Sequence, residues 1–208
     1  MAEITAQQVK ELRERTGAGM MECKSALKEA NGVISEAEVV LRKKGIASAS
    51  KKSSRATKQG LVATYIHHGG QLGVLIEVNC ESDFVARTDD FQELVHDLAM
   101  HIAAADPQFI RKEDVSESAL AREKDIQKAR AMNEGKPEKV AEKIVEGRMA
   151  KFYEEVCLYE QPFVKENTVS IDQLIKTKIA KLGENISVAR FVRFKVGETA
   201  SAESTAAE

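Results

Sequence analysis

The chain has 208 residues, which is long enough for one ordinary domain or for a small module beside a medium one. Hydrophobic residues make up 43% and charged residues 31%, so the chain can bury a core. The 31 basic and 33 acidic residues give a net charge of −2, which disfavours a protein that binds polyanions by bulk charge. No apolar run approaches the roughly 18 residues of a membrane span, and the polar N-terminus has no signal-peptide core. We therefore expect a soluble, cytoplasmic protein.

Three cysteines lie far apart in the sequence, at Cys23, Cys80 and Cys157. Their odd number and their spacing argue against a disulfide framework and against a cysteine-rich zinc site. His96 and His101 are five residues apart and do not share a helix face well, which argues against a metal pair. The chain also lacks a Gly-x-x-x-x-Gly-Lys-Ser/Thr loop for nucleotide phosphates. We therefore predict no cofactor, no metal site and no enzymatic activity.

Residues 1–45 predict three short helices in a compact bundle. Thr5 and Gln8 have the spacing of a capping box, and Gly17 with Gly19 ends the first helix. The second helix places apolar residues at i, i+3, i+4 and i+7, which are Cys23, Ala26, Leu27 and Ala30. The bundle is similar in size to a ubiquitin-associated (UBA) domain and has no catalytic constellation, which favours a binding module.

The third helix of this bundle is predicted from the same kinds of signal. Ser35 and Glu38 have the spacing of a second capping box, and Ile34 and Val39 that of a hydrophobic staple around it. We expect Gly45 to end the helix.

Two methionines, Met20 and Met21, stand side by side at the Gly17–Gly19 turn. Adjacent helical residues diverge by about 100°, so both side chains can hardly be buried in a three-helix core. In one interpretation one methionine is in the core and the other is exposed by accident. In the other, the pair forms an adaptable apolar contact surface. The spacing alone does not decide between them.

Residues 46–58 predict a basic linker that is mobile or loosely helical. No Asp or Glu occurs between Val39 and Ile76, whereas the segment from Arg42 to Lys58 carries seven Lys and Arg residues. Basic runs can bind nucleic acid through its phosphates. No aromatic residue is interleaved for base stacking, which favours a solvated linker.

Two runs rich in Val, Ile, Leu and Tyr, at residues 61–68 and 72–79, predict a β-hairpin. The segment CESDFVAR follows at residues 80–87. Next comes a helix that begins at a Thr88 cap, with one apolar face formed by Phe91, Leu94, Val95, Leu98 and Ile102. The connecting segment places a carboxylate, Asp83, beside an aromatic ring, Phe84. Either Phe84 folds back into the core while Asp83 makes a turn or cap bond, or the pair projects as a probe.

The C-terminal half predicts a helical hairpin, one more helix and a last strand. Two charge-rich helices around a Gly-Pro break form the hairpin at residues 117–156. A third capping box, at Ser170 and Gln173, begins a helix that Gly183 ends. The last strand is expected to present five residues on one face: Ile186, Val188, Val192, Phe194 and Val196.

These elements place the protein in the α+β class. We expect a UBA-like three-helix bundle, then the linker, then a core at residues 59–197. This core has a three-stranded antiparallel sheet, packed helices and the helical hairpin. Residues 198–208 are small and polar, and we expect them to be disordered.

Four segments resemble bacterial translation elongation factor Ts, and they occur in the same order as in that family. They are VKELRERTGAGMMECK at residues 9–24, CESDFVAR at 80–87, AEKIVEGRM at 141–149 and QPFV at 161–164. The resemblance covers roughly residues 4–196. One departure is Ser82, where the family more often has threonine, but the hydroxyl group is retained.

The resemblance implies a guanine-nucleotide exchange factor for the translational GTPase elongation factor Tu. In the family, the element that matches Asp83 and Phe84 pushes between helices of the GTPase beside its magnesium site. Residues Ser82 to Val85 are accordingly linked to magnesium displacement. The N-terminal bundle resembles the part that docks on the nucleotide-binding domain of the GTPase. The resemblance therefore implies that Arg13, Met20 and Met21 are contact residues. His67 is a further candidate contact.

The resemblance also bears on assembly, because longer family members carry two related sheet subdomains and this chain carries one. Some short forms of the family act as homodimers, so a homodimer is expected here. No membrane partner and no direct nucleic-acid partner are expected. Two alternatives stay open, which are an RNA-binding accessory protein that uses the basic linker and a thiol enzyme that uses Cys80.

Overall fold

A computed structural model of the protein describes residues 4–135 and 137–198. The chain forms two compact units, which we describe separately. The first contains the chain up to Val62 together with Glu77–Val95 and Gln173–Ala189, and the second contains Ala63–Ile76, His96–Asp172 and the chain from Arg190. No helix in the described part of the chain is long and apolar enough to cross a membrane. The predicted tail falls largely on residues 199–208, which lie outside the described residues.

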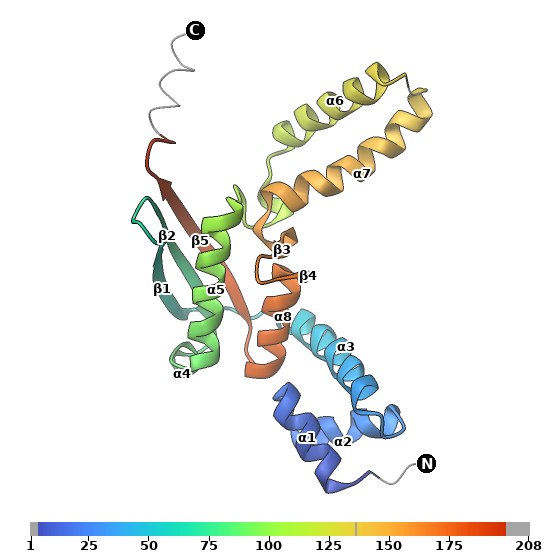
Figure 1. The fold of residues 1–208 in the computed structure, drawn as a ribbon, viewed down its shortest axis with the longest axis vertical. Coiled ribbons are helices and arrows are strands. Elements are labelled where there is room, and N and C mark those ends of the chain that lie inside the picture. Colours follow the sequence, from blue (N-terminus) through green and yellow to red (C-terminus); the bar gives the residue numbers. More distant parts are fainter. Residues whose placement is uncertain (1–3, 136, 199–208) are drawn as a thin grey trace. The chain divides into compact units, whose positions relative to one another are not determined.

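The first unit begins with the three helices α1 (Ala6–Thr16), α2 (Met20–Glu29) and α3 (Ile34–Lys52), at the blue end of the ribbon in Figure 1. The capping box at Thr5 and Gln8 is confirmed, and Gly17 ends α1 in the left-handed region at φ 69°. The side chains of the bundle core come from all three helices: Val9, Leu12, Cys23, Ala26, Leu27, Ala30 and Ala37. The apolar face predicted for the second helix is thus confirmed.

The start of α3 differs from the prediction. Its N-cap is Val33, which makes no side-chain cap bond, so the capping box at Ser35 is wrong. Glu38 instead pairs with Arg15, at 3.3 Å between oxygen and nitrogen. Val39 is 51% exposed and does not act as a staple. The helix starts earlier because Ile34, at its first position, packs against the bundle core.

The end of α3 also differs, because the helix continues past Gly45 to Lys52. Ala49 is buried in this extension, which gives it a packed face. The Ala and Lys residues that follow Gly45 are good helix formers, and a single helical glycine costs only about 1 kcal/mol. Residues 46–52 of the predicted linker are therefore helical, and Ser53–Lys58 connect the helix to the sheet.

The predicted three-stranded antiparallel sheet is confirmed, with strands β1 (Gln59–Ile66), β2 (Leu72–Cys80) and β5 (Ile186–Lys195) in the order β1-β2-β5. The His67 N–H donates to the Leu72 carbonyl at 2.8 Å and closes the hairpin. Gly69 and Gly70 form the turn with φ of 94° and 70°, values that favour glycine.

The final strand does not keep one face buried along its length. Ile186 and Val188 are buried, but Val192, Phe194 and Val196 are 40%, 68% and 71% exposed. Two consecutive exposed residues, Ala189 and Arg190, interrupt the alternation between the faces. After this point the less exposed positions are Phe191 and Arg193. Burial along the strand therefore changes after Val188, and the common face predicted for the five residues stays a prediction.

Three further helices lie beside the strands in Figure 1: α4 (Asp83–Ala86), α5 (Asp89–Ala105) and α8 (Ile171–Leu182). The apolar face predicted for α5 is confirmed, since Phe91, Leu94, Val95, Leu98 and Ile102 are all buried. Thr88 caps α5 by accepting the Phe91 N–H at 3.3 Å. The helix α8 begins directly after Ser170 and ends before Gly183, as expected, while the capping box at its start stays a prediction.

The second unit contains the predicted helical hairpin, formed by α6 (Glu117–Asn133) and α7 (Glu138–Val156), which run antiparallel in Figure 1. Two ion pairs join its arms, Lys128 with Glu138 at 2.9 Å and Arg148 with Glu134 at 2.8 Å. Short elements lie on either side of the hairpin: η1 (Lys112–Asp114), η2 (Leu158–Glu160), β3 (Pro162–Phe163) and β4 (Glu166–Ser170). The strands β3 and β4 form a small second sheet that the sequence did not predict.

A buried histidine ties α5 to this second sheet. His101 is fully buried, and its Nδ1 accepts the Val164 N–H at 3.3 Å while its Nε2 lies 3.0 Å from Gln161 Oε1. The Gln161 Nε2 in turn donates to the Glu155 carbonyl at 2.8 Å. An Nδ1 that accepts a hydrogen bond carries no proton, so the imidazole is neutral and donates from Nε2. Burial lowers the pKa of His101 below its ordinary value of 6.5.

This buried imidazole predicts a pH dependence of stability. Below about pH 6.5 the unfolded chain binds a proton that folded His101 does not, so stability falls as the pH falls. Each kcal/mol lost lowers the melting temperature by about 2–4 °C for a chain of this size. When the melting temperature is plotted against pH, the curve should therefore fall more steeply from pH 7 to pH 5 for the wild type than for His101→Gln. Parallel curves would contradict this role of His101.

Candidate functional site

The segment between β2 and α5 contains a one-turn helix that the sequence analysis treated as a connection. Ser82 is the N-cap of this helix α4, and its Oγ accepts the Val85 N–H at 3.3 Å. The Phe84 side chain is exposed, with 78% of the residue accessible, whereas Val85 and Ala86 are 6% and 4% exposed. Phe84 therefore does not fold into the core, and the interpretation of a projecting ring is the one that the structure supports.

Asp83 stands beside the exposed ring and is itself accessible. Its carboxylate accepts a hydrogen bond from the Arg87 guanidinium at 2.8 Å, and both side chains are largely exposed. A solvated pair of this kind is worth at most about 1 kcal/mol, so a partner can replace Arg87 at little cost. Asp83 and Phe84 together present one negative charge and one aromatic ring on the same turn.

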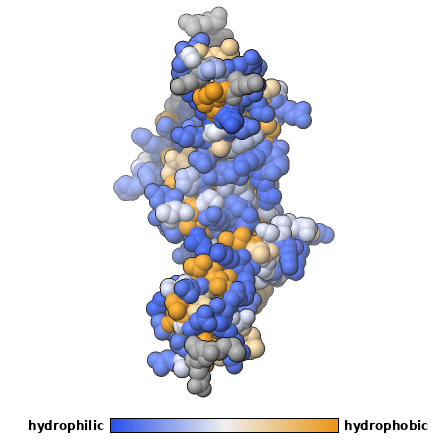
Figure 2. All heavy atoms as spheres, turned by 90° about the vertical axis from the view of Figure 1, so that its right-hand side faces the viewer, coloured by the Kyte–Doolittle hydropathy of each residue, from blue (hydrophilic) through white to orange (hydrophobic). Residues whose placement is uncertain are grey.

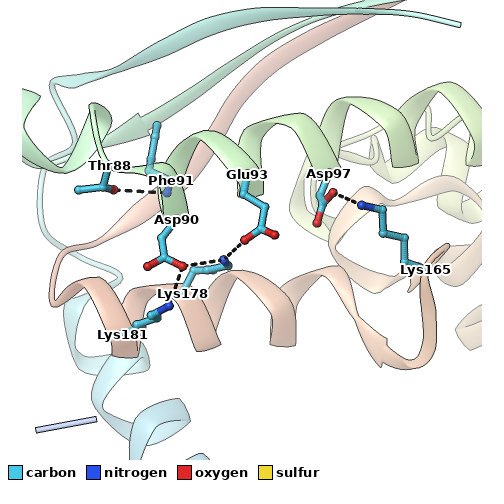
Figure 3. A network of polar contacts seen from close by, with 8 residues as sticks. All are labelled: Thr88, Asp90, Phe91, Glu93, Asp97, Lys165, Lys178 and Lys181. Atoms are coloured by element: carbon cyan, nitrogen blue, oxygen red, sulfur yellow. Dashed lines mark hydrogen bonds and ion pairs between the residues drawn. The ribbon is translucent and has the colours of Figure 1, made fainter. Parts of the chain in front are cut away.

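A network of ion pairs fixes the helix that follows α4 (Figure 3). Asp90, in the first turn of α5, bonds Lys181 at 2.7 Å and Lys178 at 3.2 Å, and Lys178 also bonds Glu93 at 2.8 Å. Both lysines belong to α8. The hydrogen bond from Lys181 lowers the pKa of the Asp90 carboxyl. The network thus joins the start of α5 to the C-terminal half of α8.

Cys80 ends β2 just before this segment, and its thiol is fully buried. Its Sγ donates to the Ser82 carbonyl at 3.1 Å. Burial raises the pKa of the thiol, and the nearby Glu184 carboxylate raises it further. A thiol enzyme needs a reactive thiol of low pKa, whereas the Cys80 thiol is buried and its pKa is raised.

The N-terminal candidates are all on the surface of the bundle. Met20 and Met21 are 56% and 76% exposed, so the interpretation that one of them is in the core is wrong. Arg13 is exposed as well. Val33, and Val39 that was predicted to form a staple, are further exposed apolar residues of the bundle. In Figure 2 orange side chains gather in the lower part of the view, where the bundle lies.

His67 lies in the second unit, directly after β1, and is exposed. Its Nδ1 lies 3.0 Å from the Tyr65 hydroxyl, and the Tyr65 ring meets the His96 ring edge-on at 5.7 Å. The resemblance selected His67, whereas His96, which comes from α5, was considered only as half of a metal pair.

The basic segment is partly neutralised in the structure. Lys44 pairs with Glu29, and Arg55 lies 3.4 Å from the Glu81 carboxylate. These ion pairs do not test the alternative of RNA binding through this segment.

The family model for elongation factor Ts matches residues 1–198. The chain belongs to the elongation factor Ts family. Membership supports a role in translation elongation.

Individual members of the elongation factor Ts family agree over nearly the whole chain. The elongation factor Ts of Solibacter usitatus is 78% identical over 204 residues, which cover 98% of this chain and 96% of the relative. That of Koribacter versatilis is 66% identical over 195 residues, covering 94% and 89%. That of Moorella thermoacetica is 60% identical over 195 residues, covering 94% and 96%.

The contrast between two phenylalanines predicts their effects on stability. Phe84→Ala should change the free energy of unfolding by no more than about 0.5 kcal/mol, because the ring is on the surface. Phe91→Ala is the matched control, since Phe91 is fully buried, and it should cost about 3–5 kcal/mol. Urea denaturation of both variants measures this. A large loss of stability in Phe84→Ala would show that the ring packs in the core.

Proposed function

We propose that this protein is a guanine-nucleotide exchange factor for elongation factor Tu and that it promotes GDP release in the cytoplasm. The observation that carries the proposal is the exposure of Phe84, next to Asp83, on a one-turn helix. The other two residues of this helix, Val85 and Ala86, are buried. Contact with a partner surface would remove the apolar ring from water, which is favourable. Family membership identifies the class of partner.

The proposed mechanism is thermodynamic coupling and needs no covalent step. If the factor and the nucleotide each weaken the binding of the other, the coupling free energy is the same in both directions. The factor must therefore make contacts that exist only when the magnesium and phosphate site of the GTPase is distorted. In this proposal Phe84 enters between helices of the GTPase beside the magnesium site, and Asp83 accompanies it.

Other residues have supporting roles in the proposal. Ser82 and Val85 hold the one-turn helix, the first through its cap bond and the second through its burial. Arg13, Met20 and Met21 dock the bundle on the nucleotide-binding domain, where flexible thioether side chains adapt to the partner surface. His67 is a further contact, together with the Tyr65 hydroxyl to which it is bonded.

The direct test is the release of labelled GDP from elongation factor Tu with and without the protein. The wild type should accelerate release. Phe84→Ala should weaken binding by about 2 kcal/mol or more, which is about 30-fold in affinity, and slow the release. Asp83→Asn keeps the shape and removes the charge, so it should impair exchange more than folding.

Met132→Ala is the control for this experiment. Met132 is 52% exposed on α6 and has no part in the proposal, so its variant should match the wild type. Wild-type protein that leaves GDP release unchanged would contradict the proposed function. Protein that instead binds RNA, with an affinity that falls steeply with salt, would support the RNA-binding alternative.

We also propose that the protein forms a homodimer through the exposed face of its sheet in the second unit. Five apolar side chains there are 40–71% exposed: Ile66, Leu75, Val192, Phe194 and Val196. The Val196 N–H donates to the Gln71 carbonyl at 2.9 Å, and counting along the ladder from this bond places Phe194 opposite Gly73. A Cβ on Gly73 would lie 2.9 Å from Ile66 Cδ1, so Ile66 covers that glycine. The apolar side chains thus form one continuous patch.

The homodimer makes a prediction about mass in solution. Phe194→Asp puts a charge in the centre of the patch and should convert a dimer into a monomer, because burying an unpaired carboxylate costs several kcal/mol. Sedimentation equilibrium over a range of concentrations measures the mass. Met132→Asp, on the exposed surface of α6, is the matched control and should leave the mass unchanged. A wild type that is monomeric at every concentration would contradict the homodimer.

A further inference from the structure

The turn between α8 and β5 forms hydrogen bonds with the residues just before the exposed Phe84. The Glu184 carboxylate accepts two hydrogen bonds from Ser82, one from its N–H at 2.9 Å and one from its Oγ at 2.6 Å. In the opposite direction, the Asn185 N–H donates to the Glu81 carboxylate at 2.6 Å. Two neighbouring residues on one segment are thus bonded reciprocally to two neighbouring residues on the other, although about a hundred residues separate them in the chain.

These bonds determine how Ser82 caps α4. The Ser82 hydroxyl donates its hydrogen to Glu184, so its lone pair is free to accept the Val85 N–H at 3.3 Å. A single helical turn has one costly nucleus and little propagation, so it is not stable by itself. The four residues of α4 therefore depend on such anchors. Glu184 is thus connected through the Ser82 hydroxyl to the helical turn that carries Asp83 and Phe84.

The same turn also holds the segment that leaves α3. The Asn185 side chain is buried, and its Nδ2 donates to the Ser53 carbonyl at 3.2 Å and to the Arg55 carbonyl at 2.8 Å. Arg55 in turn reaches the Glu81 carboxylate at 3.4 Å. The connector after α3, the start of α4 and the turn after α8 therefore form one closed set of hydrogen bonds.

We propose that Glu184 is a positioning residue for nucleotide exchange, which holds Ser82 so that Phe84 projects in one geometry, and that Asn185 couples the connector after α3 to that geometry. The proposal rests on the exchange function proposed above. A ring that distorts another protein must be held rigidly, because a loose ring can bind without transmitting force to the magnesium site. Glu184 need not contact the GTPase to do this.

The test separates the maximal rate of GDP release from the factor concentration at half-saturation. Glu184→Ala should lower the maximal rate about tenfold and move the half-saturating concentration by no more than about twofold, because docking through the bundle is retained. Glu184→Gln, which keeps the shape and can accept only through one oxygen, should show a smaller loss in the same direction. Amide hydrogen exchange at Val85 should accelerate in both variants, since the cap is loosened.

Asp97→Asn is the matched control. The Asp97 side chain is 14% exposed and pairs with Lys165 at 2.6 Å (Figure 3), so the variant removes a comparable carboxylate that bonds no residue of the 80–87 segment. Its maximal rate should equal that of the wild type. Melting curves of every variant give the folded fraction, so that rates are compared per folded molecule.

A double variant distinguishes positioning from general stability. Ser82→Ala removes the hydroxyl bond to Glu184 but keeps the bond from the Ser82 N–H, so if Glu184 acts through Ser82 the double variant Ser82→Ala with Glu184→Ala should lose clearly less exchange activity than the product of the two single losses. Losses that multiply would overturn the proposal, and so would a normal maximal rate in Glu184→Ala. A wild type that does not accelerate GDP release would instead overturn the proposed function, so the two failures can be told apart.

Discussion

The position of the exposed aromatic ring depends on the pair of hydrogen bonds between the Glu184 carboxylate and Ser82. A one-turn helix has too few internal bonds to offset the entropy of ordering it. Its conformation is therefore set by what its ends touch. At one end Ser82 is held by Glu184, and behind the ring Val85 and Ala86 are buried. Phe84 points outward because its neighbours are already fixed.

Residues in and directly after α8 form bonds on both sides of α4. Its last turns carry Lys178 and Lys181, which share a helix face and reach Asp90, and the turn that follows carries Glu184. These charges are partly exposed, so they add modestly to stability. Their contribution is geometric, because they fix the direction in which α4 and α5 leave the sheet. In the proposed exchange factor, this direction is what allows a small probe to act on a partner.

Both units expose apolar side chains to solvent, but the types of side chain differ between the units. The first unit exposes flexible methionines on the bundle and one rigid ring on α4, while the second exposes a flat row of aliphatic and aromatic groups on a sheet. Flexible thioethers suit a surface that must adapt, and a flat sheet face suits a large, self-complementary contact. This difference supports separate roles in docking, exchange and self-association.

Local signals in the sequence predicted most of the helices, the three-stranded sheet and the candidate residues. The capping box at Thr5 and the apolar face of α5 follow from short-range spacing, so they could be predicted. The motif around Asp83 and Phe84 indicated a candidate site. It could not say whether the ring was buried, because burial depends on what packs against the segment from elsewhere in the chain.

Tertiary contacts decided the features that local patterns predicted wrongly or left open. The helix α3 runs past Gly45, where Ala49 has a buried position, and β5 buries Ile186 and Val188 but exposes Val192 and Phe194. Glu184 carries no local signal at all, since its partner Ser82 lies 102 positions away. Spacing along a helix or strand reports which residues share a face, but only the folded chain brings distant residues within hydrogen-bonding distance.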